Sequence, residues 1–171
     1  GCITEAAERT ISHLAYQPIE TGSYRVCFTP EAFLSLIGAF SSMVNARAVL
    51  DGVSLSQRES IGTTLAVPFF SLHDDGLHPG NVSASSFDGE GTPTQSVCLI
   101  EGGALKSFLH SEATARAFGV APTGHAGLGA KVSVGADWFV VSTTAGQHSG
   151  TELDHRSAAD PFVLIEDLSA L

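Results

Sequence analysis

Basic residues are scarce in this sequence. The chain has 8 lysines and arginines against 18 aspartates and glutamates, and its formal net charge at pH 7 is −10. The bases are scattered along the chain and form no cluster of the kind that nucleic-acid-binding surfaces show. An acidic membrane surface is an equally poor partner for such a chain. The sequence therefore predicts no binding to nucleic acid and none to a membrane.

Cysteines and long apolar runs are also few. Cys2, Cys27 and Cys98 are widely separated and form no C-x-x-C motif, so neither a disulfide framework nor a cysteine zinc site fits. We interpret them as thiols in a reducing cytoplasm, which is the expected location. No apolar run reaches the roughly 18 residues that a membrane span requires. The first residues lack the basic and apolar regions of a signal peptide, so none is expected.

The composition is otherwise that of a folded globular protein. The chain has 171 residues, of which 43% are hydrophobic and 15% are charged, so one domain with a sizeable core is expected. Helical patterns occur at 4–16, 29–52 and 112–118. The pattern at 29–52 has the clearest signal for a helix N-terminus, because Thr29 is a good N-cap and Pro30 suits the first helical turn. Its apolar residues recur at helical spacing and are expected to face the core: Phe33, Leu36, Ile37, Phe40, Met43 and Val44.

Several short stretches have the pattern of β-strands. They lie at 23–28, 67–72, 96–101, 104–109, 130–135, 137–143 and 161–168. The clearest hairpin joins 96–101 to 104–109 across a pair of glycines. The stretches 73–81 and 121–130 are rich in turn residues and are expected to be loops. Strands and helices follow no βαβ rhythm, so the predicted fold class is α+β, with a mostly antiparallel β-sheet and a few helices.

The seven histidines offer no standard zinc site. A zinc-peptidase helix needs two imidazoles one turn apart together with a glutamate, and no two histidines have that spacing. In "HDDGLH", His73 and His78 enclose Asp74 and Asp75. This turn would hold a cation only through a chance arrangement, and a solvated turn is the preferred interpretation.

Motifs for nucleophilic catalysis and phosphate binding are weak. A Ser/His/Asp triad needs no proximity in sequence and stays open, but no G-x-S-x-G elbow is present. The glycine-rich "GHAGLG" at 124–129 neither clearly follows a strand nor opens a helix. We therefore interpret it as a flexible loop and not as a phosphate cradle.

Two carboxylates stand close together in "SFDGEGTPTQ". Asp88 and Glu90 could form a general acid/base pair, since side chains two residues apart point the same way in an extended chain. The preferred alternative is structural. Asp88 then caps a turn, and Glu90 accepts backbone N–H groups or pairs with a base.

This stretch opens an ordered series of motifs. They are D-x-E-G-x-P-T at 88–94, L-I-E-x-G-x-L at 99–105, Ala-Arg at 115–116 and Thr-Gly at 123–124. In this order they resemble the TldD/PmbA family, whose members are also called modulators of DNA gyrase. The stretch 21–33 resembles the strand and helix that open the family's C-terminal domain. The acidic balance argues against reading the gyrase name as DNA binding.

The resemblance implies a C-terminal domain rich in antiparallel β-structure and a family with two kinds of subunit. The TldD kind is similar to a zinc metallopeptidase, with an H-E-x-x-x-H helix and a later cysteine ligand. The PmbA kind, also called TldE, pairs with it and lacks those ligands. The pair is linked to proteolysis and to the maturation of peptide antibiotics.

The helix predicted to start at Thr29 decides between the two kinds. No histidine occurs between Phe28 and Leu72, and Cys98 does not match the late cysteine ligand. The chain therefore resembles the PmbA/TldE kind, with zinc expected only in a TldD-like partner. We expect residues 1–171 to be a single, partial C-terminal domain. Residues 1–18 would form a linker helix from an N-terminal domain, and the apolar end "VLIEDLSAL" is expected to continue further.

The predicted function is that of a non-catalytic partner subunit in a TldD/TldE-type metallopeptidase complex that processes peptides or proteins. The alternative is a metallopeptidase in its own right, with a non-standard metal site. Expected partners are a TldD-like subunit and a peptide substrate, and a homo-oligomer is a further option. No catalytic residue and no metal ligand is assigned. The candidate substrate or interface residues are Asp88, Glu90, Gly91, Thr94, Arg116 and Gly124.

Overall fold

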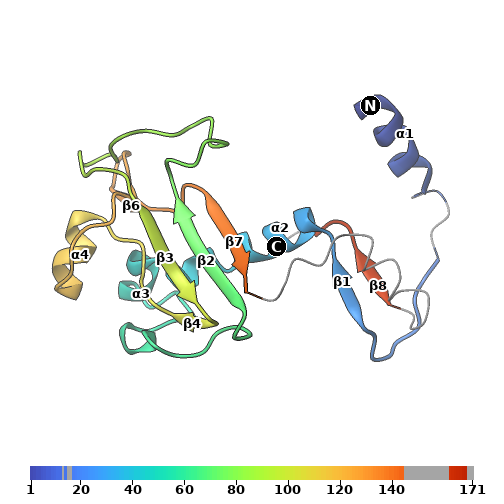
Figure 1. Cartoon of the computed structure of the whole chain (residues 1–171), viewed down its shortest axis with the longest axis horizontal. Coiled ribbons are helices and arrows are strands. Elements are labelled where there is room, and N and C mark those ends of the chain that lie inside the picture. The colour runs from blue at the N-terminus through green and yellow to red at the C-terminus, as the bar shows by residue number, and fades with distance from the viewer. Residues whose placement is uncertain (13, 15–16, 145–161, 169–171) are drawn as a thin grey trace.

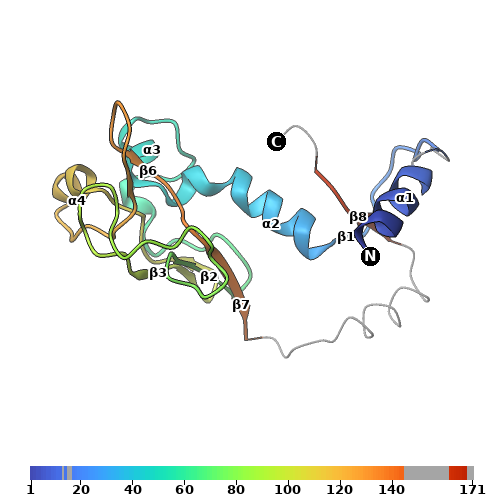
Figure 2. The same cartoon turned by 90° about the horizontal axis from the view of Figure 1, so that it is seen from above.

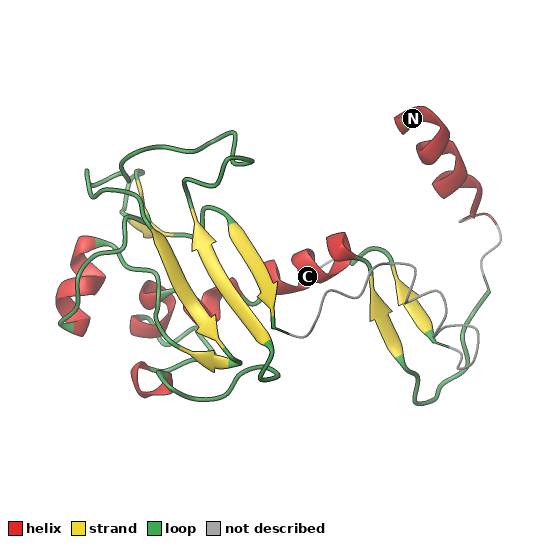
Figure 3. Ribbon diagram, in the orientation of Figure 1, coloured by secondary structure: helices red, strands yellow, loops and turns green. Residues whose placement is uncertain are grey.

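Antiparallel strands dominate the fold. The computed structural model of the chain describes residues 1–12, 14, 17–144 and 162–168. The largest sheet contains β2 (Phe70–Asp75), β3 (Ser96–Glu101), β4 (Ala104–Leu105) and β7 (Phe139–Thr143), in the order β4-β3-β2-β7. All its neighbouring strands are antiparallel (Figures 1 and 3). The predicted α+β class with a mostly antiparallel sheet is confirmed.

Two smaller sheets complete the β-structure. β5 (Ala126–Gly127) pairs with β6 (Ser133–Val134) in antiparallel fashion, whereas β1 (Val26–Phe28) pairs with β8 (Val163–Ile165) in parallel. The helices are α1 (Cys2–Ser12), α2 (Pro30–Ala39), η2 (Ser41–Val44), α3 (Ala46–Leu50), η3 (Arg58–Ser60) and α4 (Glu112–Phe118). In Figure 2, α2 runs from the β1–β8 pair toward the four-stranded sheet, where α3 lies.

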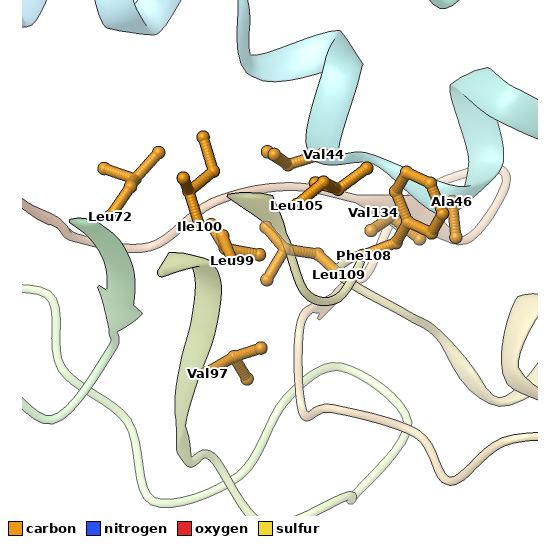
Figure 4. Packing of buried hydrophobic residues seen from close by; sticks show 10 residues of the cluster. All are labelled: Val44, Ala46, Leu72, Val97, Leu99, Ile100, Leu105, Phe108, Leu109 and Val134. Atoms are coloured by element: carbon orange, nitrogen blue, oxygen red, sulfur yellow. The ribbon is translucent and has the colours of Figure 1, made fainter. Parts of the chain in front are cut away.

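One buried cluster lies between this sheet and the segment that carries η2 and α3. Its members are Val44, Ala46, Leu72, Val97, Leu99, Ile100, Leu105, Phe108, Leu109 and Val134 (Figure 4). Leu99 and Leu105 are completely buried. His110 is also buried, and its ring contacts the rings of Phe108 and Phe118 edge to face. Burial lowers the pKa of His110 to about 4, so this side chain is uncharged at pH 7.

The single helix predicted over 29–52 is wrong. Thr29 does cap α2 by accepting from Ala32 N, but α2 ends at Ala39, and η2 and α3 follow as separate pieces. Asn45 is extended, and its Oδ1 accepts from the N–H groups of Arg47 and Ala48. Its amide nitrogen donates to Val134 O. These capping and tertiary hydrogen bonds outweigh the local helical pattern.

Several further boundaries differ from expectation. β1 covers only 26–28 of the predicted strand 23–28, and β6 covers only 133–134 of the predicted strand 130–135. Helix α1 begins at Cys2, two residues before the predicted start, and the apolar side chains of Ile11 and Leu14 are 65% and 81% exposed. Strand β2 continues to Asp75, through the first part of the predicted turn 73–81. The predicted loop 121–130 contains β5. Pairing with β7 and β6 supplies the backbone hydrogen bonds that local turn signals do not reveal.

The hairpin turn and the third predicted helix are confirmed, but β4 covers only residues 104–105 of the predicted strand 104–109. Gly102 and Gly103 join β3 to β4 with φ angles of 55° and 79°, which a two-residue hairpin turn requires. Helix α4 occupies 112–118, as predicted. Ser111 caps its start by accepting from Thr114 N, and Gly119 ends it in the left-handed conformation.

In the described part of the chain, none of the helices has both the length and the apolar character that crossing a bilayer demands. The expectation of a linker helix at 1–18 stays a prediction.

Candidate functional site

Asp88 organises the turn 86–95. Its Oδ1 accepts from the N–H groups of Glu90 and Thr92, both at 2.9 Å. Its Oδ2 accepts from Ala126 N at 3.0 Å, which attaches the turn to β5. Three backbone donors fix the orientation of this carboxylate and join it to two segments of the chain. The geometry is that of the structural alternative, in which Asp88 caps a turn.

Glu90 binds a different part of the backbone from Asp88. Its Oε2 accepts from Glu112 N at 2.8 Å, at the first residue of α4. A negative charge at a helix N-terminus is favourable, because the first N–H groups have no partner within the helix. The two carboxylates therefore hold two different pieces of backbone and do not form an acid/base pair.

Glu90→Ala is expected to lower the free energy of unfolding by about 1 kcal/mol, because Glu112 N loses its acceptor. Glu90→Gln keeps an acceptor oxygen and should lose less. Urea unfolding followed by circular dichroism measures both changes. Ser111→Ala, which removes the other cap of α4, is the reference variant. Equal stability of the wild type and Glu90→Ala would contradict the capping role.

Glycine at 124 is required by a close backbone approach. Gly124 has a φ of 75°, and a Cβ at this position would lie 2.4 Å from Pro93 O and 2.9 Å from Thr94 Cα. The side chain of Thr94 is in turn nearly buried. Gly91, with a φ of 81°, has open space around it and serves only the turn. The structure thus brings Asp88, Thr94 and Gly124 together.

Arg116 lies apart from this group. Its side chain is 78% exposed, and it forms an ion pair with Glu112 of the same helix at 3.1 Å. An exposed pair of this kind contributes little to stability. Of the six candidates, Arg116 has the least support from the geometry.

Asp74 is a buried residue beside the candidate site that the sequence pattern did not reveal. It is completely buried, and its carboxylate accepts from Asp137 N at 2.9 Å and from Trp138 N at 2.7 Å. The predicted solvated turn for "HDDGLH" is wrong at this residue, because the side chain points into the protein from β2. The alternation in "FSLHDD" is the one signal that could have placed Asp74 on the inner face.

His125 lies beside Asp74. Its side chain is completely buried, its Nδ1 contacts Thr123 Oγ1 at 2.9 Å, and its Nε2 lies 3.8 Å from Asp74 Oδ2. Thr123 in turn accepts from His110 N at 2.7 Å. The interpretation of "GHAGLG" as a flexible loop is therefore wrong at His125, because tertiary hydrogen bonds order this segment.

A cavity of about 260 Å³ lies beside His125. Its walls include Asp88, Thr94, Gly124, His125 and Asp137. Burial raises the pKa of Asp137, His125 lowers it, and the negative charges of Asp74 and Asp88 raise it. The cavity is thus acidic, and it is formed by segments far apart in the sequence.

The described residues contain no group of side chains suited to binding a metal ion. Across residues 1–12, 14, 17–144 and 162–168, no three His, Cys, Asp or Glu side chains are grouped so that they could hold a metal ion. His13, His148 and His155 lie outside those ranges. Cys98 is half-buried in β3, and burial raises the pKa of its thiol, followed by the negative charge of Glu101. A raised pKa disfavours the thiolate that metal binding needs.

Comparison with protein families gives a match over most of the chain. The family model described as "PmbA/TldA metallopeptidase C-terminal domain" matches residues 21–170. A metalloprotease of Methanocaldococcus jannaschii is 29% identical over 112 residues, which are 65% of this chain and 25% of the relative. A PmbA-homologous metalloprotease of Haemophilus influenzae is 26% identical over 126 residues, 71% of this chain and 27% of the relative. The chain thus spans about a quarter of the length of these relatives.

Solved structures show the same architecture. A protein from Thermotoga maritima, described as a candidate modulator of a DNA gyrase, has 32% identity and a TM-score of 0.83. The match covers 96% of this chain and 37% of the solved one. TldE from Thermococcus kodakarensis has 22% identity and a TM-score of 0.72 over 96% of this chain and 38% of its own. The second likeness is one of fold alone.

Proposed function

Since this chain belongs to the PmbA/TldD metallopeptidase family through its C-terminal domain, we propose that it is the non-catalytic, TldE/PmbA-like partner subunit of a TldD/TldE-type peptidase. In such a pair the TldD-like subunit would hold the zinc ion and cleave peptides. This chain would contribute to assembly and to the handling of the peptide. The proposed location is the cytoplasm, where the net charge of −10 also favours solubility.

The observation that carries this proposal is the lack of a zinc-ligand set where one is expected. Helix α2 reads PEAFLSLIGA and contains no histidine. A tetrahedral zinc site needs three or four close nitrogen, sulfur or oxygen ligands, and no such group exists among the residues with a described position. The described residues do not fit zinc, so we derive no catalytic step through it.

An apolar groove beside α2 supports the role of a partner subunit. The groove has a volume of about 470 Å³, and its lining residues include Phe33, Ile37, Phe40, Val67 and Phe70. Phe40 is 47% exposed and Val67 is 49% exposed. Clustered exposed apolar side chains are typical of protein–protein contacts. We assign the TldD-like subunit as the occupant of this groove.

The test combines the purified chain with a TldD-like protein from the same genome. Alone, the chain should contain far less than one zinc per chain by plasma mass spectrometry and should cleave no peptide. Together, the two should form a stable complex that cleaves peptides. Phe40→Asp should weaken the complex by about tenfold or more, whereas Val82→Asp, at a fully exposed residue outside the groove, should not. One tightly held zinc per chain, or cleavage by the chain alone, would instead favour a metallopeptidase in its own right.

A further inference from the structure

Strand β1 has one edge without a partner strand in the described part of the chain. It pairs only with β8, in a sheet of two parallel strands. Figures 1 and 2 both show this pair apart from the four-stranded sheet, at the other end of α2. Parallel strands usually lie in larger sheets with both faces covered, and two strands alone are marginally stable. On physical grounds, further strands are therefore expected to complete the β1–β8 sheet.

The register of the pair identifies the backbone groups on this open edge. Arg25 O and Thr29 N form hydrogen bonds of 2.8 and 2.9 Å with β8, and Cys27 lies between them. The N–H and C=O of Cys27 therefore also face β8. Alternate residues of a strand direct these groups to opposite edges, so the N–H and C=O of Val26 and Phe28 face away from β8. These four groups are the ones that a further strand would bind.

We infer that β1 of a second copy of this chain binds this edge in antiparallel fashion, with a two-fold axis between the two Cys27 residues. In this register Val26 of each copy lies opposite Phe28 of the other, and each of these two pairs exchanges both N–H···O bonds. All the outward backbone groups of β1 then have partners. The result is a four-stranded sheet in the order β8-β1-β1-β8, and both copies use the same surface, as two-fold dimers do.

The side chains of β1 suit this register. Val26 and Phe28 lie on one face of the strand and are 46% and 38% exposed. Opposite one another they form two aromatic–β-branched pairs, which stabilise antiparallel strands. Residues 26–28 include no proline and no charge, although natural sheet edges are commonly protected by such residues. The adjacent charge, Arg25, lies opposite Thr29 of the second copy and not opposite another Arg25.

The expected dimer is weak, because only three residues of each copy pair and the contact is smaller than a standard interface of about 1,600 Å². Sedimentation velocity of the full, reduced chain between about 10 and 500 µM should show a shift from one chain to two. Val26→Lys, which places a charge on the edge strand, should raise the dissociation constant at least tenfold. Leu164→Lys is the matched control, since Leu164 is 48% exposed on β8, and it should leave dimerisation unchanged.

Cysteine cross-linking tests the register. The two Cys27 residues would form a non-hydrogen-bonded pair with Cα atoms about 4.5 Å apart, which is within the range of a disulfide. Diamide, as the oxidant, should join two copies by taking up two electrons and two protons from the two Cys27 thiols. Cys2→Ser/Cys98→Ser keeps only Cys27, and Cys27→Ser/Cys98→Ser keeps only Cys2. Although Cys2 is exposed and Cys27 is half-buried, the chain with Cys27 should form covalent dimers at least tenfold faster.

This inference does not depend on the proposed function, in which a TldD-like subunit contacts the groove beside α2. Phe40→Asp changes that groove and should leave self-association unchanged. Four results would overturn the proposal: a single chain at every concentration, equal weakening by Val26→Lys and Leu164→Lys, loss of the dimer in Phe40→Asp, or equal cross-linking rates of the two single-cysteine variants.

Discussion

Asp74→Ala is expected to lower the free energy of unfolding by about 3–5 kcal/mol. The carboxylate is completely buried and accepts two backbone N–H groups, from Asp137 and Trp138. Its removal leaves both donors, in part-buried surroundings, without their acceptor, and it opens a space in the interior where the carboxylate lay. Since a domain is typically stable by only about 5–15 kcal/mol, this single change should remove a large part of the total. Urea unfolding followed by far-UV circular dichroism measures the loss.

Asp75→Ala is the matched control, because Asp75 is the next residue of β2 and is only half-buried. Its cost should stay within about 1 kcal/mol. Asp74→Asn, which keeps the shape but only one accepting oxygen, should fall between the two. The fluorescence of Trp138, the only tryptophan, reports on the loop that Asp74 holds. If Asp74→Ala and Asp75→Ala unfold at the same urea concentration, the hydrogen bonds of Asp74 do not stabilise the fold as argued.

Gly124→Ala should have the second-largest effect, a loss of more than about 3 kcal/mol. The residue has a φ of 75°, and the new methyl group would lie 2.4 Å from Pro93 O. The methyl group can be accommodated only if the backbone of residues 93–94 moves away from residue 124. That backbone belongs to the turn that Asp88 holds, so the cavity should be distorted as well. Thermal unfolding of the purified variant measures the change.

Gly91→Ala separates the cost of the positive φ angle from the cost of the close contact with Pro93. Gly91 has a similar φ of 81°, but nothing lies within 4 Å of the position of a Cβ. Only the conformational strain remains, which costs about 1–2 kcal/mol for a non-glycine residue. Equal losses in the two variants would show that strain alone matters, and that the close approach to Pro93 is not a constraint.

Features that depend on residues close in sequence could be predicted. The paired glycines at 102–103 require a two-residue hairpin, and the structure has it. Helix α4 begins after Ser111 and ends at Gly119, because capping is decided within one turn of the chain. Asp88 caps its own turn for the same reason. Local hydrogen-bonding rules were sufficient in all three cases.

Features that depend on distant partners could not be predicted. The helical pattern over 29–52 is continuous, yet Asn45 interrupts it with a hydrogen bond to Val134 O. Asp74 stands in a run that reads as a turn, and its burial depends on the backbone of Asp137 and Trp138. His125 stands in a glycine-rich stretch, and Thr123 and Asp74 hold it in place. No local pattern contains these partners.

The family, the α+β class, the hairpin turn and the capped helix could all be inferred from residue order, since each depends on motifs or on neighbours within a few residues. The folded chain was needed to see that Asp88 and Glu90 hold backbone in separate places, that Asp74 is buried beside His125, and that His125 and Asp137 line one acidic cavity. The physical reason is that burial and charge proximity are properties of residues brought together from distant segments. Backbone N–H groups of one segment satisfy the carboxylates of another, and that pairing exists only after the chain has folded.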